Sequence, residues 1–460
     1  MYNDWCNSFR NITETRHPVR LTTIKGIVPK KIKGRYFKIN PADISDNINH
    51  PYDGNGLISC FSFEDGEIYY KSKYVDTKHK ILEDKFGIRL FQGAFGTKGL
   101  LPLIKNPGNT TVISWNKELL VFSESGIPYR IDIDTLETKG GLLNFKEGLP
   151  YRTNSSILNK ILYNIGIFGD NICAHPKNYE DRLILYKIDH LNNDSSVITF
   201  YEIDTDMNIL SIKKHKINSR LYFVHDFIVT KNYYVIVQPP LDIKLNKIGD
   251  GVVNALSENK DKTNIVHVIP RSKEYKSYEC ELLNGFITHH FNIPQTDIWN
   301  RFIDVFSIIY PNMLDWNNMG NDNNKSEIYK TEIDTHTGFT SQRVVLNKSV
   351  EFPIYDADKQ TIYAIDYSDS IGMNNIIKIN MKEYNDKGML FDYDIWKSTY
   401  KSFYGEPAIV DDYILTTCYN PSMKCSYLYI FNKDISAGPI SISKIPVNLP
   451  VGLHGCWLGE

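Results

Sequence analysis

Four of the twelve histidines lie beside apolar stretches that are typical of buried strands. His175 lies in NICAHPK, His225 in LYFVHDFIVT, His289 in GFITHHFN and His454 in LPVGLHG. A single buried histidine is usually a hydrogen-bonded core residue, but four in such surroundings weaken that explanation. Neutral imidazole suits iron, copper, zinc and nickel as a ligand. We therefore take these four histidines as candidate metal ligands.

Three glutamates also stand in mostly apolar runs. They are Glu124 in LLVFSESG, Glu351 in SVEFPIY and Glu406 in YGEPAIV. A buried carboxylate is costly unless a donor pairs with it. Carboxylates often accept a hydrogen bond from the outer nitrogen of a metal-bound histidine. These glutamates are therefore candidate partners of the histidines, although each could also be an edge residue that faces solvent.

Short strand-like runs must position these side chains. Runs of β-branched and aromatic residues, each followed by turn residues, span 66–75, 118–124, 182–189, 196–204, 233–240 and 360–368. Long amphipathic helical patterns are scarce, which predicts one large all-β domain of the sandwich, barrel or propeller type. The spacings of 50 residues from His175 to His225 and 64 from His225 to His289 each approximate one propeller blade. One histidine per blade could then meet the others on a central axis.

Composition excludes several classes of protein. Hydrophobic residues make up 42% and charged residues 23% of the 460 residues, as in an ordinary globular protein. A net charge of −2 argues against a nucleic-acid partner. The seven cysteines are widely spaced and form no CxxC pair, so neither a disulfide framework nor a zinc ribbon is indicated. Without a signal peptide or a run of about 18 apolar residues, the expected location is cytoplasmic.

An ordered series of motifs resembles the carotenoid cleavage oxygenase family. It begins with GIVPKKIKGRYFKINPADI (26–44) and HPYDGNG (50–56), and continues through NTTVI, ESGIPYRIDIDTLETKG, AHPK, HDFIVT, HHFN, EFP, EP and LPVGLHG. The similarity runs from about residue 25 to residue 458. One departure is Lys38-Ile39-Asn40-Pro41, where the family usually has R-N-G-P.

The resemblance implies a fold and a metal site. The fold is an all-β, seven-bladed β-propeller with a dome of loops and short helices over its top face. Residues 1–460 would form one carotenoid oxygenase domain, with 1–24 as an N-terminal extension and 25–458 as propeller plus dome. One Fe(2+) per chain would be held by His175, His225, His289 and His454. Glu124, Glu351 and Glu406 would hydrogen-bond to His225, His289 and His454.

The resemblance also implies a reaction. The chain would be a non-haem iron dioxygenase that uses O₂ to cleave a C=C bond of an apolar polyene, a carotenoid or apocarotenoid, into two carbonyl products. A stilbene-cleaving activity of the same family is an alternative, but that group typically has Lys where this chain has Ser123. One animal branch isomerises retinyl esters instead. A non-enzymatic β-propeller scaffold, which would need no metal, is the alternative from another class.

The resemblance further implies peripheral association with a membrane face. The segment FQGAFGTKGLLPLIKN (91–106) is the candidate, because it combines apolar residues with Lys98 and Lys105. An ordinary dome segment packed on the core is the alternative. The apolar residues of the candidate patch are Phe91, Phe95, Leu100, Leu101, Leu103 and Ile104.

Overall fold

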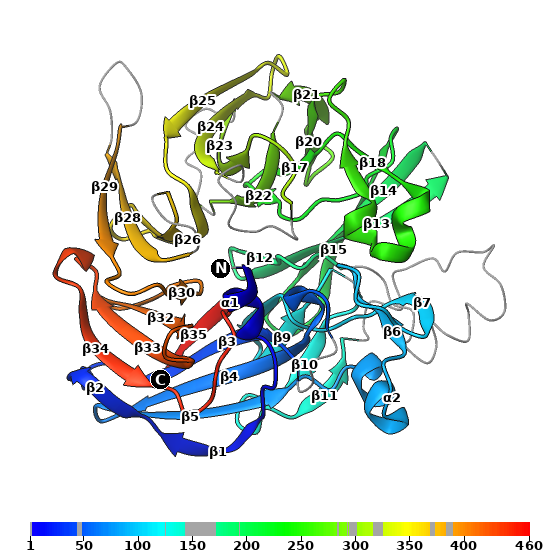
Figure 1. Ribbon diagram of the computed structural model, residues 1–460. Coiled ribbons are helices and arrows are strands. Elements are labelled where there is room, and N and C mark those ends of the chain that lie inside the picture. The colour runs from blue at the N-terminus through cyan, green and yellow to red at the C-terminus, as the bar shows by residue number, and fades with distance from the viewer. Residues whose placement is uncertain are drawn as a thin grey trace.

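The fold is a ring of seven β-sheets around a central axis (Figure 1). The computed structural model describes residues 2–43, 48–124, 126–142, 172–192, 194–282, 285–291, 293, 301–315, 325–368, 373–382 and 390–460. In these residues strands predominate and the few helices are short. The all-β, seven-bladed propeller is therefore confirmed.

Each blade is an antiparallel sheet, and its strands follow one another in space from one edge to the other. Blade 1 has β1 (Thr15–Arg20), β5 (Glu67–Tyr74), β4 (Asn55–Glu64), β3 (Gly34–Ala42) and β35 (Gly455–Gly459). Blade 2 has β11 (Thr138–Gly141), β10 (Tyr129–Ile131), β9 (Glu118–Phe122) and β8 (Thr111–Trp115). Blade 3 has β12 (Lys177–Tyr179), β13 (Arg182–Asn192), β14 (Ser195–Ile203) and β15 (Ile209–Ile217). Blade 4 has β16 (Ile228–Val229), β17 (Tyr233–Gln238), β20 (Asn264–Pro270) and β21 (Tyr278–Leu282).

The remaining blades follow the same plan. Blade 5 has β22 (Phe286–His290), β23 (Phe302–Tyr310), β24 (Glu327–Asp334) and β25 (Thr340–Leu346). Blade 6 has β26 (Val350–Asp356), β27 (Thr361–Asp366), β28 (Asn375–Lys382) and β29 (Leu390–Lys397). Blade 7 has β2 (Thr22–Gly26), β34 (Pro439–Lys444), β33 (Cys425–Asn432), β32 (Tyr413–Asn420) and β30 (Phe403–Tyr404), and β31 (Ala408–Val410) also pairs with β32.

Turn chemistry in the sequence explains how the strands reverse. Asp65 and Gly66 join β4 to β5 with φ angles of 48° and 85°, and Glu64 pairs with Glu67. Two central residues with positive φ define the hairpin turn that matches strand twist, and Asp-Gly favours it. Asn116 and Lys117 make the equivalent turn between β8 and β9, with φ angles of 47° and 58°. These turns fix the register in which each strand faces its neighbours.

Burial falls from the middle of a blade to its outer edge. All six residues of β27, a central strand, are buried. The outermost strand β15 alternates between half-buried and exposed residues, including exposed Leu210 and Ile212. The apolar core lies between adjacent blades, as where Phe37 and Ile58 of blade 1 pack with Leu119 and Val121 of blade 2. The blades therefore hold one another in a closed ring.

Two blades join segments from opposite ends of the sequence. In blade 1, β35 pairs with β3, with Phe37 opposite Cys456. In blade 7, β2 pairs with β34, with Thr22 opposite Lys444. Residues 1–24, expected as an extension ahead of the propeller, thus include β1 and the start of β2. The assignment of the whole chain to one domain stays a prediction.

Short elements outside the blades form the dome. They are α1 (Tyr2–Asn7), η1 (Pro51–Asp53), α2 (Lys78–Phe86), β6 (Phe91–Gln92), β7 (Leu101–Ile104), β18 (Leu241–Ile243), η3 (Leu245–Asp250), α4 (Val252–Ala255) and β19 (Leu256–Glu258), while η5 (Ile435–Ala437) lies between β33 and β34. Thr77 caps α2 by accepting the N–H of Lys80, and Gly87 ends it at φ 66°. Within the described ranges, no helix is both long and apolar enough to cross a membrane.

Candidate metal centre

The four candidate histidines enter the axis from four blades. His175 lies just before β12 and His225 just before β16. His289 belongs to β22, and His454 directly precedes β35. The innermost strand of each blade lies beside the central axis (Figure 1). His175 and His454, which are 279 positions apart in sequence, therefore meet at this axis.

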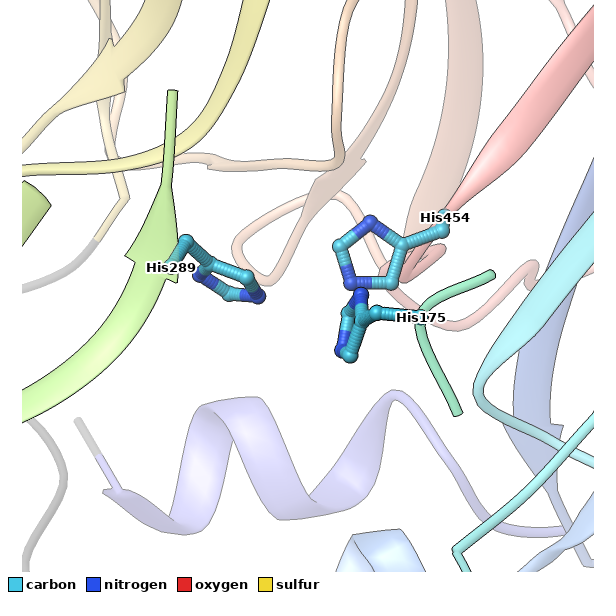
Figure 2. Close-up of side chains that lie close together, drawn as sticks. All are labelled: His175, His289 and His454. Atoms are coloured by element: carbon cyan, nitrogen blue, oxygen red, sulfur yellow. The ribbon is translucent and has the colours of Figure 1, made fainter. Parts of the chain in front are cut away.

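The imidazole rings face a common point. Figure 2 shows His175, His289 and His454 directed toward one another, and one ring nitrogen from each lies within 4.8 Å of the others. The Nε2 atoms of His175 and His225 are 3.0 Å apart. The ring of His225 is also centred 5.1 Å from that of His289. All four rings therefore belong to one buried cluster.

A carboxylate accepts a hydrogen bond from the outer nitrogen of three of these rings. Nδ1 of His289 lies 2.6 Å from Oε2 of Glu351, and Nδ1 of His454 lies 2.8 Å from Oε1 of Glu406. The hydrogen bond of His225 goes to Glu124. A carboxylate only accepts, so each Nδ1 carries the proton and each Nε2 keeps its lone pair for the centre.

Two β-bulges, one in blade 5 and one in blade 6, orient His289 and Glu351 toward each other. Between Ile287 and His290, β22 has one residue more than β23, so Thr288 and His289 oppose a single residue. A bulge of this kind redirects side chains, and bulges are frequent beside active sites. As a result both residues reach Glu351, whose Oε1 is 2.8 Å from Oγ1 of Thr288. A second bulge follows Glu351 in β26, where Phe352 has a φ of 57°.

The glutamates differ in how firmly they are held. Glu351 accepts further hydrogen bonds from Thr288 and from the hydroxyl of Tyr310, at 2.5 Å. Glu406 also accepts the backbone N–H of Gly455 at 2.8 Å. The side chain of Glu124 is 36% exposed, against 9% for Glu351 and 12% for Glu406. The cluster is therefore most open on the side of Glu124 and His225.

Burial keeps two of the imidazoles neutral. It lowers the pKa of His175 well below its ordinary value, and neighbouring imidazoles act in the same direction. Burial also lowers the pKa of His454, although Glu406 opposes the shift. For His225, burial is outweighed by the charge and hydrogen bond of Glu124, which raise the pKa. Neutral rings are the form that binds metals.

The donor set fits a transition-metal ion. Among the described residues, the buried Nε2 of His289 has no hydrogen-bond partner. Two nitrogens about 2.1 Å from one ion, at right angles, would lie about 3 Å apart, close to the 3.0 Å between His175 and His225. Imidazole ligands with carboxylate partners are typical of such sites. The arrangement could hold a divalent ion with positions left for small ligands.

Several contributors lie outside the seven expected residues. The hydroxyls of Thr288 and Tyr310 donate hydrogen bonds to Glu351. Lys38 donates a hydrogen bond to the carbonyl of Leu453, the residue before His454. Lys38 is fully buried, and its Nζ donates to the carbonyls of Leu453 at 2.6 Å and Glu406 at 3.1 Å. This charged residue in an apolar strand is visible in the sequence as part of the departure at residues 38–41. Tyr310 has no comparable signal in its local sequence.

The candidate membrane segment turns only part of its apolar side chains outward. Leu100 is 70% exposed and Leu101 39%, whereas Leu103 and Ile104 are half-buried. Phe91 is buried, and Phe95 is stacked on His50. The expectation that Lys105 flanks the patch is wrong, because its ammonium is buried against Glu83 of α2. The exposed set, called the dome rim below, comprises Phe86, Ile88, Leu100, Leu101 and Leu245.

The elements of the dome rim lie side by side. The backbone N–H of Leu101 donates to the carbonyl of Leu90 at 2.7 Å, which joins β7 to the segment after α2. Nε2 of Gln92 donates to the carbonyl of Gly249 at 3.1 Å, which joins β6 to η3. The exposed apolar side chains of these elements therefore gather on one part of the dome.

Comparison with known proteins identifies relatives over the whole chain. The family model described as retinal pigment epithelial membrane protein matches residues 9–459. An apocarotenoid-15,15'-oxygenase from Synechocystis sp. is 25% identical, covering 94% of this chain and 92% of the relative. An isoeugenol monooxygenase from Pseudomonas putida is 24% identical, covering 94% and 93%. A carotenoid 9,10(9',10')-cleavage dioxygenase 1 from Pisum sativum is 22% identical, covering 98% and 89%.

Solved structures show the same fold. A cobalt-substituted apocarotenoid oxygenase of Synechocystis superposes with a TM-score of 0.82 at 21% identity, covering 100% of this chain and 99% of the other. A chimera of that oxygenase and a retinal pigment epithelial protein gives a TM-score of 0.83 at 22% identity, with the same coverage.

Lys38 predicts a pH dependence of stability. Burial lowers its pKa from 10.5 to about 8 in the folded protein. The folded state therefore binds fewer protons than the unfolded state between these values, so stability rises with pH across this range. Relative to Lys38→Met, we expect the unfolding free energy of the wild type to increase by up to about 3 kcal/mol. Urea unfolding at pH 7.5, 9.0 and 10.5 measures it, and parallel pH profiles of the two proteins would contradict it.

Proposed function

Because the chain belongs to the retinal pigment epithelial membrane protein family, we propose that it is a non-haem Fe(II) dioxygenase that cleaves a C=C bond of a carotenoid or apocarotenoid. Its relatives include apocarotenoid and carotenoid cleavage oxygenases. The observation that carries the proposal is the buried cluster of four histidines with three carboxylates behind them.

In this proposal one Fe(2+) is held by Nε2 of His175, His225, His289 and His454. Ferrous iron, when bound, would supply the electrons that activate O₂ beside the substrate. The carboxylates keep Nδ1 of their histidines protonated, which fixes the ring orientation and strengthens the donor nitrogen. Burial would raise the pKa of Glu351, but His289, with smaller contributions from the hydrogen bonds of Tyr310 and Thr288, lowers it. The same two hydrogen bonds hold the carboxylate in place.

The overall reaction balances without a further reductant. One C=C bond breaks, and each of its carbons receives one oxygen atom of O₂, which gives two carbonyl products. No proton has to be gained or lost. The protein's task is therefore to bind, orient and shield the apolar substrate, and a water-excluding site favours this chemistry.

The residue before Glu124 supports an apolar substrate. Ser123 is buried and directly precedes this carboxylate. In the stilbene-cleaving group, as the sequence resemblance implies, a lysine at this position holds a phenol oxygen. A short hydroxyl cannot supply that positive charge. A phenolic phenylpropanoid remains the second candidate substrate, because isoeugenol monooxygenases are among the relatives.

We further propose that the dome rim contacts a membrane in which the polyene is dissolved. Leu100, Leu101, Phe86, Ile88 and Leu245 present exposed apolar surface. The nearby Lys98 is exposed, with its ammonium near the carbonyl of Gly249 and 3.3 Å from Oδ1 of Asp250. An apolar surface flanked by a cation is suited to a lipid interface.

Iron content tests the metal centre. We expect near one iron per chain in the wild type after anaerobic Fe(II) loading, and a large loss in His225→Ala, which removes one ligand. His215→Ala, on the outer strand β15, is the matched control and should keep its iron. Elemental analysis by mass spectrometry measures the ratio. A wild type that takes up no iron would overturn the proposal.

Product analysis tests the substrate class. Iron-loaded protein should convert an apocarotenal and O₂ into two carbonyl products and should turn over isoeugenol much more slowly. Liquid chromatography with mass spectrometry identifies the products, with His225→Ala as the inactive control. Faster cleavage of isoeugenol would favour the phenolic substrate instead.

Liposome binding tests the dome rim. Leu100→Glu combined with Leu101→Glu should weaken sedimentation with phosphatidylcholine vesicles by on the order of tenfold or more, because burying one leucine contributes about 1.5–3 kcal/mol. Leu210→Glu with Ile212→Glu changes two other exposed apolar residues, on β15, and should have no effect. Equal binding of both double variants, whether retained or lost, would contradict the proposal.

A further inference from the structure

A buried ion pair adjoins the histidine cluster. Nζ of Lys177 lies 2.7 Å from Oδ1 of Asp226, and the two side chains are 10% and 3% exposed. Both groups therefore lie in the protein interior, on the segments that carry His175 and His225.

Asp226 connects three of the segments that carry histidines. It directly follows His225 in the chain, and its Oδ2 accepts the backbone N–H of His290 at 2.9 Å, the residue after His289. Its Oδ1 also accepts the N–H of Phe227 at 2.8 Å. Lys177, two residues after His175, completes the connection to blade 3. One carboxylate thus joins blades 3, 4 and 5 at the axis.

His175 differs from the other three histidines. Glu124, Glu351 and Glu406 hydrogen-bond to His225, His289 and His454, but none of the described carboxylates hydrogen-bonds to His175. The backbone around His175 must therefore set the direction of its ring. Two buried groups anchor that backbone: the N–H of Cys173, two residues before His175, donates to the carbonyl of Tyr186 at 2.9 Å, and Lys177, two residues after it, forms the ion pair.

The buried ion pair stabilises the contact between blades less efficiently than apolar side chains would. A buried pair is often no more stabilising than apolar residues of the same size, because both charges lose their hydration. Apolar contacts already join these blades, as Phe227 packs with Tyr186 of blade 3. The ion pair adds a fixed distance and orientation between Nζ of Lys177 and the carboxylate of Asp226. An apolar contact would leave both the distance and the orientation less defined.

We propose that Lys177 and Asp226 are positioning residues that fix His175 relative to His225 and His289, and thereby set the affinity and ligand number of the metal centre. The inference rests on the proposed iron site. It assigns to this pair the role that a glutamate has for each of the other three histidines, exerted through the backbone and not through the ring.

The test uses a charge-neutral double variant and a matched control. Lys177→Met with Asp226→Asn removes both charges and leaves one acceptor oxygen, which can serve one of the two backbone N–H groups. Lys433→Met with Asp356→Asn removes another lysine–aspartate pair, 2.6 Å apart, in which the lysine is half-buried and the aspartate buried, at the far end of β26 from Glu351. Fe(II) affinity is measured by competition with a chromophoric chelator, ligand number by the visible absorption of Co(II)-loaded protein, and folding by thermal unfolding without metal.

We expect the Lys177/Asp226 variant to bind Fe(II) at least tenfold more weakly and to show a changed Co(II) spectrum. The control variant should lose thermal stability only, and Lys177→Arg should recover most of the affinity. If the double variant does not fold, Lys177→Met alone, which leaves both backbone hydrogen bonds to Asp226, should show the same loss. Wild-type affinity and spectrum in these variants would overturn the positioning role. A wild type that binds neither metal would overturn the iron centre itself.

Discussion

The structure depends on one constraint, that imidazoles from separate blades must each direct a nitrogen lone pair to the same point. The hydrogen bond from Nδ1 to a carboxylate meets this constraint for three rings, because it fixes both the tautomer and the rotation of the ring. The bulges of β22 and β26 bring the partners His289 and Glu351 within reach of each other. The propeller is the scaffold that makes such convergence possible.

Charge balance explains why so many ionisable groups are buried at the axis. Four carboxylates surround the rings, and two ammonium groups, of Lys38 and Lys177, face them or the adjoining carbonyls. When all four imidazoles are neutral, as metal binding requires, two negative charges are left in excess. A divalent cation would offset them, and bound cations are often the largest local charge in such a site. The net charge of these residues therefore favours a bound divalent cation over a site without a metal.

Much of the site could be predicted because its residues are ionisable side chains within otherwise apolar strand-like runs. The histidines and glutamates stand out in this way, and so does Lys38. Tyr310 could not be found, because it reaches Glu351 through the pairing of neighbouring blades, 41 residues away in sequence. Neither bulge has a local signal. The apolar neighbours of Lys105 in the chain predict that it flanks the membrane patch. The structure instead pairs it with Glu83 of α2, a partner that the local sequence does not reveal. The strand pattern alone left sandwich, barrel and propeller open, since it does not reveal how many sheets close a ring.

The pairing of β3 with β35 has a consequence for how the protein is made. Lys38 and the carbonyl that it binds at Leu453 are 415 residues apart in the chain. Contacts of such separation form late, because the entropy of loop closure must be overcome before they contribute. During synthesis six blades can assemble on the ribosome while the first still lacks its inner strand. A metal ion that arrives early would meet three histidines and an open ring, so the complete centre can form only after β35 has paired with β3.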